Sequence, residues 1–535
     1  MNYTKLALKN ISSYGDTDIF PYPIENALFY DMSNEAITIV DKMISQMDEI
    51  RSGLYPINRV SISVPVGYTG YRWTTFIDPW WNAALLSIVL SISEQIECYR
   101  KPALDNCIFS YRIKLNEDTG ECFDKDFNWR KFYETSMQKA KQYKYVVRFD
   151  IADFYNRIYH YRLDNALENR IGIEKGKVDK IMKVLMTLSG NVSYGLPVGG
   201  NAARILAEAY LATIDKVLDT EGVPFCRFVD DFILFAMSKE EAYQFLNISA
   251  DLLMKSEGLT LQKNKTVIMT SSEFENHAIS LLEGEEDLKL DKQRNTFYKM
   301  HIHYDPYSLT AIEDYEELKS RIAEFDLISF INSEVKKSKI HQSFAKQIIS
   351  AIKFLDKDRI ELAIAVIIEN IESLYTIFPN VIQMIIKVID GCNENTKVEV
   401  REKICRLINE DSYLMQTENN ACYIVRLLSH LPETSSSRAI NLLYGRPGAS
   451  ELLRSNCILA MVNMKEYEWL SSKKTNYNSM SILEKRAFYS ASFYLRDEGA
   501  HWRRSIVNFL DEGSKALGEW ITTKCPTHTS WKLPI

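Results

Sequence analysis

The sequence lacks paired cysteines. Its nine cysteines stand singly along the chain, there is no C-x-x-C pair, and the odd total leaves one over. Neither a disulfide framework nor a structural zinc site is therefore expected. Isolated thiols favour a reducing compartment, and we expect a cytoplasmic protein.

Long apolar runs are also missing. The most apolar stretch, residues 83–92, is too short to cross a bilayer. The N-terminus has no charged start followed by an apolar core, as a signal peptide would. We therefore expect no membrane partner and no anchor.

An excess of basic residues is the third absence. The formal net charge is −7, which excludes an overall basic binder of polyanions and confines any nucleic-acid contact to a local groove. With 535 residues, 46% of them hydrophobic and 25% charged, the chain has the composition of a soluble globular protein of two to four domains.

The pattern of the first hundred residues changes from helix to strand and back. Residues 1–57 form an N-terminal helical and loop extension, with apolar residues spaced by three and four between Ala36 and Met47. Residues 60–66 and 71–76 read as strands around a glycine turn. A helix is predicted to begin at Asp78-Pro79.

The middle of the chain predicts an α+β sheet with helices on one face. Alternation in residues 144–151 indicates a strand that ends at Asp150, with that acid on the face opposite Val147 and Phe149. A glycine-rich loop at 189–201, a helix at 202–218, a hairpin at 227–235, a helix at 240–257 and a strand at 258–269 follow. We place this unit at residues 58–300.

Residues 301–535 show almost only helical periodicity. Breaks at Pro379, Gly391, Pro432 and Pro447 divide this part into successive helices. Helices paired in this way predict an irregular all-α solenoid of the HEAT kind, although no clean repeat is visible.

Two adjacent acids, Asp230 and Asp231, stand between the apolar runs of the predicted hairpin. Taken alone, such a pair is typical of a solvated turn. A third acid, Asp150, ends an upstream strand, and three carboxylates from different strands are what two Mg²⁺ ions would need. The order of these elements along the chain favours a metal-dependent site.

These segments resemble the motifs of reverse transcriptases. Residues 149–155 (Phe-Asp-Ile-Ala-Asp-Phe-Tyr) resemble motif A, 195–199 (Gly-Leu-Pro-Val-Gly) motif B and 227–231 (Arg-Phe-Val-Asp-Asp) motif C. Residues 258–266 are similar to motif D, and Arg72 with Asp78-Pro79 resembles the fingers motif of retron-like and unknown-group enzymes. The resemblance covers roughly residues 55–280 and implies a fingers and palm domain. With an all-helical C-terminal half, the chain looks most like the abortive-infection (Abi) group of bacterial phage-defence polymerases.

The resemblance implies a role for each matching residue. Asp150, Asp230 and Asp231, with the backbone carbonyl of Ile151, would hold two Mg²⁺ ions for phosphoryl transfer. Lys265 would protonate the leaving pyrophosphate, or is simply a solvated lysine. The substrate-binding set would comprise Arg72 at the triphosphate, Tyr155 beneath the sugar, and Asp153, Phe154, Gly195, Pro197, Val198 and Gly199 around them.

Some of these residues have plainer alternatives. Arg72 could be a surface strand arginine and Tyr155 a core tyrosine. Arg112 is a weaker second candidate for the triphosphate. A tyrosine under the sugar would clash with a ribose 2′-hydroxyl, so dNTPs are the expected substrates.

Two positions depart from the family pattern. Val198 stands where motif B usually has glutamine, and Phe228 where motif C has tyrosine. Because that glutamine ordinarily contacts the template or the nucleotide, its loss argues against ordinary copying. The Abi resemblance implies untemplated synthesis primed by a protein hydroxyl, a single-stranded DNA product attached to the protein, and a homo-oligomer. Among 30 tyrosines the primer stays open, with Tyr14 and Tyr22 as candidates.

Two alternatives remain. The same palm could copy an RNA template conventionally, or the protein could be a catalytically silent scaffold whose helices bind a phage or host protein. Three intact carboxylates argue against the scaffold, because a buried acidic cluster costs several kcal/mol in repulsion and desolvation.

Overall fold

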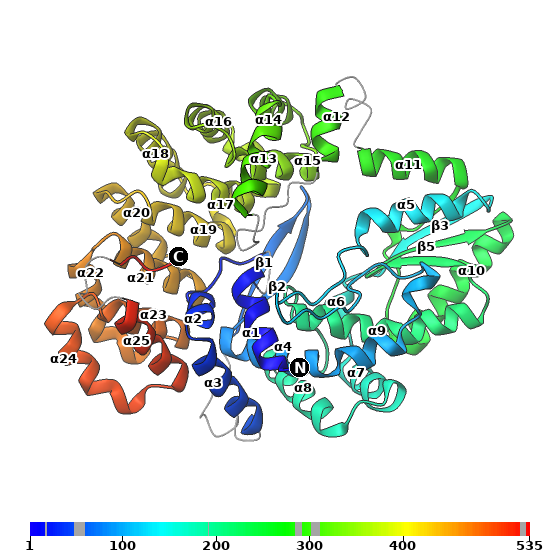
Figure 1. Ribbon diagram of the computed structural model, residues 1–535, viewed down its shortest axis with the longest axis horizontal. Helices are drawn as coiled ribbons and strands as arrows, with labels where there is room; N and C mark the ends of the chain where they lie inside the picture. The colour runs from blue at the N-terminus through cyan, green and yellow to red at the C-terminus, as the bar shows by residue number, and fades with distance from the viewer. Residues whose placement is uncertain (16–18, 48–58, 191, 284–291, 301–310, 525–530) are drawn as a thin grey trace.

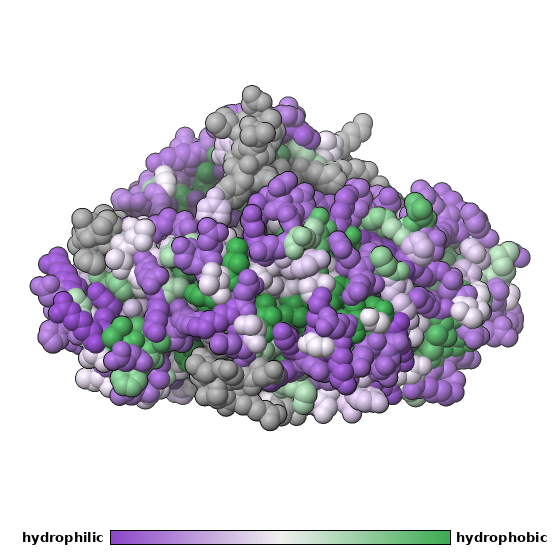
Figure 2. Space-filling model, turned by 60° about the horizontal axis from the view of Figure 1, so that its bottom comes forward, coloured by the Kyte–Doolittle hydropathy of each residue, from purple (hydrophilic) through white to green (hydrophobic). Residues whose placement is uncertain are grey.

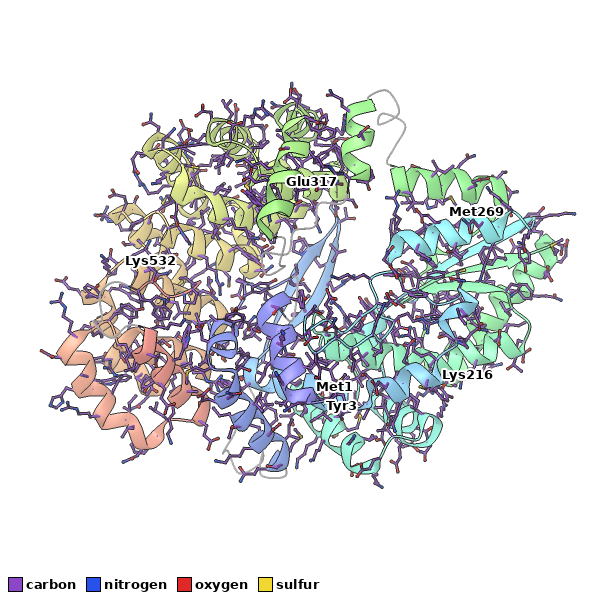
Figure 3. The ribbon with its side chains drawn as sticks, viewed as in Figure 1. Met1, Tyr3, Lys216, Met269, Glu317 and Lys532 are labelled. Atoms are coloured by element: carbon purple, nitrogen blue, oxygen red, sulfur yellow. The ribbon has the colours of Figure 1, made fainter. Side chains whose placement is uncertain are left out.

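The computed structural model describes residues 1–15, 19–47, 59–190, 192–283, 292–300, 311–524 and 531–535. Figure 1 shows a sheet with its helices on the right, a curved array of helices on the left, and a two-stranded hairpin with the N-terminal helices between them. In Figure 3, Met269 and Lys216 mark the sheet side and Glu317 and Lys532 the helical array.

The sheet on the right has four antiparallel strands in the order β4-β5-β3-β6. These strands are β3 (Tyr145–Asp150), β4 (Phe225–Phe228), β5 (Asp231–Ala236) and β6 (Val267–Thr270). We call this sheet and its helices the palm. Its strand order brings the C-terminal end of β3 beside the start of β5.

Helices cover both faces of the palm sheet, so the prediction of helices on one face is wrong. Helices α5 (Trp129–Ala140) and α11 (Ser271–Glu283) pack on one face, and α9 (Asn201–Thr220) and α10 (Lys239–Leu252) lie on the other side. The reason is visible in β3, where neighbouring Val146 and Val147, which point to opposite faces, are both fully buried.

The last strand of the palm is shorter than predicted. The ladder with β3 comprises Val267–Thr270, and Leu261 forms a separate bridge with Ile151, whereas a continuous strand at 258–269 is expected from the sequence. Gly258 adopts a φ of +67°, and Lys263–Lys265 forms a short 3-10 turn. Polar residues in a row at 263–265 favour this turn over a strand.

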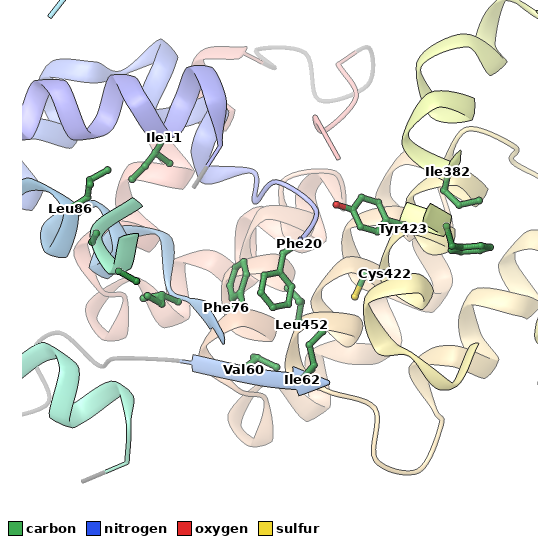
Figure 4. Close-up of a cluster of buried hydrophobic side chains, with 14 of the residues drawn as sticks. Ile11, Phe20, Val60, Ile62, Phe76, Leu86, Ile382, Cys422, Tyr423 and Leu452 are labelled. Atoms are coloured by element: carbon green, nitrogen blue, oxygen red, sulfur yellow. The ribbon is translucent and has the colours of Figure 1, made fainter. Parts of the chain in front are cut away.

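The hairpin consists of β1 (Arg59–Val66) and β2 (Gly70–Ile77). Val60, Ile62 and Phe76 are buried on one face, and Figure 4 shows them beside Phe20 and Leu452 in the core between the hairpin and the helical array. The opposite face carries Ser61, Ser63, Tyr71 and Trp73, which are exposed. The hairpin therefore has a packed face and an open face.

Helix α4 (Pro79–Tyr99) begins at Pro79, as predicted. The Asp78 carboxylate accepts a hydrogen bond from the Trp80 amide at 3.1 Å and caps the helix. Its other oxygen binds Arg486 of the helical array. This buried ion pair joins the chain between β2 and α4 to the helical array.

The N-terminal helices α1 (Tyr3–Tyr14), α2 (Glu25–Asp31) and α3 (Ser33–Ser45) belong to the same core. Helix α1 packs against α4, and Phe20 meets Phe76 edge to face at 5.6 Å. The Trp520 indole donates to Asp31 at 2.8 Å. Residues from both ends of the chain thus enclose the hairpin.

Everything described beyond residue 310 is helical or loop, in agreement with the all-α prediction. Alternate helices pack on one another: α14, α16, α18 and α20 form one layer, and α15, α17, α19, α21, α23 and α25 form a second. Figure 1 shows these layers curving around the hairpin. The helices are α12 (Lys292–Lys299), α13 (Ala311–Ala323), α14 (Leu327–Val335), α15 (Gln342–Ile352), α16 (Lys357–Glu369), α17 (Phe378–Val388), α18 (Glu394–Asn409), α19 (Glu418–Ser429), α20 (Thr434–Tyr444), α21 (Glu451–Asn463), α22 (Tyr467–Ser472), α23 (Ile482–Ser492), α24 (Arg496–Ile506) and α25 (Glu512–Lys524).

Within the described ranges, no single helix is long and apolar enough to span a membrane. The pair formed by residues 357–369 and 371–391 would pass by length and composition, but it bends by 93°. Its isoleucines, including Ile364, Ile367 and Ile382, are buried in the array. The face in Figure 2 is mainly hydrophilic, with hydrophobic residues in smaller patches.

Candidate active site

Three aspartates meet at one edge of the palm sheet. Strands β3 and β5 pair so that Asp150 lies opposite Asp231. The Ile151 amide donates to the Asp230 carbonyl at 3.2 Å, which holds the β4-β5 turn against the end of β3. The fold thus brings the predicted catalytic acids together from two segments of the chain.

Burial, together with repulsion between the acids, raises the pKa of Asp230 and Asp231. Burial and the charges of Asp150 and Asp231 raise the pKa of Asp230 to about 7. Burial and Asp150 raise the pKa of Asp231 to about 6, against the opposing effects of Arg148 and Lys265. A bound cation would stabilise buried acids whose pKa values are raised in this way.

The side chain of Lys265 contacts the acidic cluster. Lys265 binds Asp150 through Nζ and Oδ2. Burial lowers the pKa of Lys265, but the hydrogen bond to Asp150 and the charges of the three aspartates outweigh it and raise the pKa. The segment before Lys265 runs along the end of β3, where the Gln262 amide donates to the Asp150 carbonyl at 2.8 Å. Lys265 is therefore part of the acidic site.

The three aspartates fit a hard divalent cation by their chemistry. Carboxylate oxygens and a backbone carbonyl such as that of Ile151 are the ligands that such ions prefer. In the described part of the chain, however, no group of three or more His, Cys, Asp or Glu side chains is arranged for a metal ion. Of the three carboxylates, that of Asp150 also contacts the Lys265 ammonium.

The turn between β4 and β5 is strained. Val229 adopts a φ of +55°, a left-handed conformation that is unfavourable for a β-branched residue. Two buried side chains hold it there: the Ser110 hydroxyl accepts from the Val229 amide at 2.9 Å, and Arg227 Nη1 donates to the Val229 carbonyl at 2.9 Å. These contacts fix the backbone that carries Asp230.

Arg227 is the centre of a fully buried ion network. Its guanidinium donates to both oxygens of Asp215 at 2.8 and 2.6 Å, and to both oxygens of Glu208 at 3.2 and 2.9 Å. Arg100 also binds Glu208, at 2.7 Å. Despite complete burial, the two carboxylates raise the pKa of Arg227. The sequence contained one signal of this role, an arginine in a buried strand position three residues before the first of the two acids.

Tyr155 and the glycine-rich loop lie together beside the acids. The Tyr155 carbonyl accepts from the Leu196 amide at 2.8 Å, and the Ile158 carbonyl accepts from Gly195 at 2.8 Å. Burial raises the pKa of the Tyr155 phenol, and the nearby Tyr111 and Asp230 add to this. Tyr155 thus lies near enough to Asp230 for their charges to interact, and its contact with the sugar stays a prediction.

Several of the predicted substrate-binding residues have a backbone with positive φ. Gly195 and Gly199 have φ values of +98° and +133°, which side chains rarely adopt. Asp153 is also left-handed, with a φ of +50°, and precedes the short helix α6 (Phe154–Arg157). Phe154 is buried in the core and supports Tyr155 rather than a ligand.

Val198 joins the palm to the hairpin. Its side chain is buried, as is Pro197, and its carbonyl accepts from the Thr75 amide of β2 at 3.4 Å. A glutamine here could offer an amide to a template or nucleotide, whereas a buried valine offers only packing. The loop is held by its backbone and has no polar side chain at this position.

Arg72 lies away from this site. It shares a hairpin face with Val64 and Thr74 and lines a cavity against α15, α17 and α19. Arg59, which contacts the palm through the Leu188 carbonyl, points to the opposite face. This placement does not support the predicted contact between Arg72 and the triphosphate.

Arg112 does not fit a role at the triphosphate, whereas Tyr14 and Tyr22 stay predicted primers. Arg112 is buried and pairs with Glu97 at 2.9 Å, which makes it a structural residue. Tyr14 is the last residue of helix α1 and does not lie in the loop predicted from the sequence. Its hydroxyl donates to the Thr119 carbonyl at 3.0 Å. The Tyr22 hydroxyl donates to the Tyr14 backbone carbonyl at 3.0 Å, and both side chains are exposed.

Comparison with known proteins agrees with this geometry. Residues 92–298 match the family model described as reverse transcriptase (RNA-dependent DNA polymerase). No protein in the search of curated proteins matches the chain.

Similar solved structures include telomerase of Candida albicans in complex with a fragment of telomeric RNA. It is 10% identical, with a TM-score of 0.28, over 70% of this chain and 69% of that one. Apo telomerase of Candida tropicalis is 11% identical, with a TM-score of 0.30, over 78% of this chain and 73% of that one. Both TM-scores are too low to support a functional comparison.

Proposed function

We propose that this protein, which contains a reverse transcriptase domain, is a DNA polymerase that adds dNTPs to a hydroxyl of the protein itself without copying a template. The observation that carries the nucleotidyl transfer is the cluster of Asp150, Asp230 and Asp231, which the pairing of β3 with β5 and the bond from the Ile151 amide to the Asp230 carbonyl bring together. Such acids are held together against their repulsion, as a cation site requires.

The chain's own residues prepare the site for transfer. Divalent ions, which we propose to be two Mg²⁺, would bind the three carboxylates and the Ile151 carbonyl and would neutralise charge on the reacting phosphate. Lys265 holds a proton at Nζ beside Asp150, where a leaving pyrophosphate can receive it. Arg227 and Ser110 fix the turn that carries Asp230.

Two features favour untemplated addition. Val198 gives the glycine-rich loop no side-chain amide to contact a template, and its side chain is buried. The open hairpin face carries Tyr71 and Trp73, which are 67% and 60% exposed. Exposed aromatic rings of this kind stack on the bases of a single strand irrespective of sequence.

Because motifs A to D are similar to those of the Abi polymerases, we also propose a biological role. We propose a cytoplasmic, homo-oligomeric enzyme of abortive infection whose single-stranded DNA product stays attached to the protein. The two layers of alternate helices suit a HEAT-like array that binds a phage or host trigger.

One experiment tests the function. The full chain is incubated with MgCl₂ and labelled dNTPs, without primer or template, and the products are run on a denaturing protein gel. Label that migrates with the protein, and that proteinase releases, is the expected result. Asp230→Asn should abolish the label. Asp126→Asn, an equal change at an exposed aspartate remote from the sheet edge, should leave it unchanged.

The alternatives give different results. Incorporation only on an added RNA template with a primer would replace the proposal by conventional reverse transcription. No incorporation under any of these conditions, with Asp230→Asn identical to the parent, would leave the scaffold function.

A further inference from the structure

A cavity of about 200 Å³ lies between the packed face of the hairpin and the helical array. Residues of β1 and β2 form one wall, and residues of α15, α17 and α19 form the other. At about 30 Å³ per water molecule, it has room for roughly seven waters, which is enough for part of a nucleotide but not for all of it. The cavity therefore belongs to neither unit alone.

The charged side chains that line the cavity are basic. The described residues that line it include Arg72 and Lys346 but no aspartate or glutamate, although acids outnumber bases in the chain by 71 to 64. Within the described part of the protein, neither Arg72 nor Lys346 forms an ion pair with a carboxylate. Both side chains are exposed to solvent at the cavity, so an anion can reach them there without breaking an existing ion pair.

Buried polar groups add a second, independent indication. Asn419 is 1% exposed, and its amide nitrogen donates to the Ile19 carbonyl at 2.9 Å. Its oxygen has no hydrogen-bond partner among the described residues, and the same holds for the Thr376 hydroxyl. Both residues line the cavity. A buried unpaired acceptor costs about 1–3 kcal/mol, so a ligand with a donor would relieve it.

The cavity walls are already joined at the hairpin tip. The Tyr71 hydroxyl lies 3.2 Å from that of Tyr375, and the Ile340 amide donates to the Tyr68 hydroxyl at 2.7 Å. These bonds close the cavity on the tip side. A ligand between the walls would hold the same two units together.

We propose that this cavity is a second nucleotide site, which binds the phosphate of a nucleotide between Arg72 and Lys346, outside the palm. Arginine and lysine supply the charge, and the unpaired Asn419 oxygen and Thr376 hydroxyl would bond the sugar or base once their side chains turn toward it. That the phosphate is carried by a nucleotide rests on the proposed function, whereas the phosphate preference rests on the cavity alone. The carrier is either a free mononucleotide or a DNA strand.

The test is equilibrium dialysis of labelled dTMP against the full chain carrying Asp230→Asn, in EDTA, so that binding does not depend on catalysis or on metal. We expect saturable binding of one dTMP per chain. Lys346→Glu places a like charge beside the phosphate and should weaken binding at least tenfold. Lys346→Arg should retain binding. The matched control is Lys357→Glu, an exposed lysine of α16 outside the cavity, which should not change it.

Parallel dialysis with oligo(dT), inorganic phosphate and deoxythymidine identifies the carrier. If oligo(dT) binds the parent but not Lys346→Glu, and dTMP does not bind the parent, the ligand is a DNA strand. If dTMP binds the parent but not Lys346→Glu, and oligo(dT) does not bind the parent, the ligand is a free mononucleotide. Competition by inorganic phosphate would support recognition of the phosphate. The proposal is overturned if no ligand binds, if deoxythymidine binds as well as dTMP, or if Lys346→Glu and Lys357→Glu bind equally. Because no incorporation is measured, a failure of the polymerase assay leaves this result intact.

Discussion

The buried arginine beside the catalytic turn allows the most detailed prediction. In Arg227→Gln, Glu208 keeps its hydrogen bonds to Arg100 and Ser110, but Asp215 loses its only hydrogen-bonded partner among the described residues. An uncompensated buried carboxylate of this kind costs about 3–5 kcal/mol. We therefore expect a large fall in the free energy of unfolding, and a loss of activity as the Val229 turn relaxes.

A second variant separates the two effects. If the cost comes from the unpaired charge on Asp215, then adding Asp215→Asn to Arg227→Gln should recover about half of the lost stability or more. The bond from Arg227 to the Val229 carbonyl stays absent, so activity should recover much less than stability. Lys255→Gln, which removes an exposed cation paired with Asp251, is the control and should cost no more than about 1 kcal/mol.

Urea denaturation followed by circular dichroism measures the stability, and incorporation of labelled dNTPs measures the activity. The reasoning fails if the double variant is no more stable than Arg227→Gln, because the cost would then not arise from charge. It also fails if both variants keep parental activity, since the turn would not depend on Arg227.

Three further predictions follow from single residues. Burial raises the pKa of Glu25 from 4.5 to about 7, so the folded protein keeps a proton that the unfolded chain loses between these values. Stability should therefore fall by at most about 3 kcal/mol as the pH rises through this window. Glu25→Gln should flatten the dependence of Tm on pH between 5 and 8, and a slope as steep as that of the exposed control Glu35→Gln would contradict this. Tyr155→Ala should lower the kcat/KM preference for dTTP over UTP about tenfold or more, and an unchanged ratio would exclude contact with the sugar. Trp73→Ala should weaken oligo(dT) binding by about 1–3 kcal/mol, measured by fluorescence anisotropy, whereas Trp129→Phe should not; equal affinities would show that the open hairpin face binds no bases.

Local patterns in the sequence were sufficient for the elements near the site. The Asp78-Pro79 start of α4, the hairpin strands, and the strand that ends at Asp150 each depend on neighbouring residues, and the structure confirms them. The acid pair and the upstream acid could be placed together because the motif order implies adjacent strands. The all-helical character of the second half was equally readable from periodicity.

Other features depended on residues that are distant in the chain. A strand buried on both faces, such as β3, shows no one-sided pattern, so the second layer of helices was missed. The face of the hairpin on which Arg72 lies became meaningful only when the helical array was seen to pack there. The network of Arg227 with Glu208 and Asp215 joins a strand to a helix, and its charges would have been placed at the surface by composition alone.

The sequence by itself determined which acids form the candidate catalytic cluster, because their spacing follows from local strand and turn preferences. Only the tertiary structure decided what neutralises and supports them. Lys265 reaches Asp150, Arg227 holds Val229, and Arg72 faces a second cavity because long-range packing fixes which side chains meet. Electrostatic energies depend on such distances and on burial, and neither quantity is encoded in any short stretch of residues.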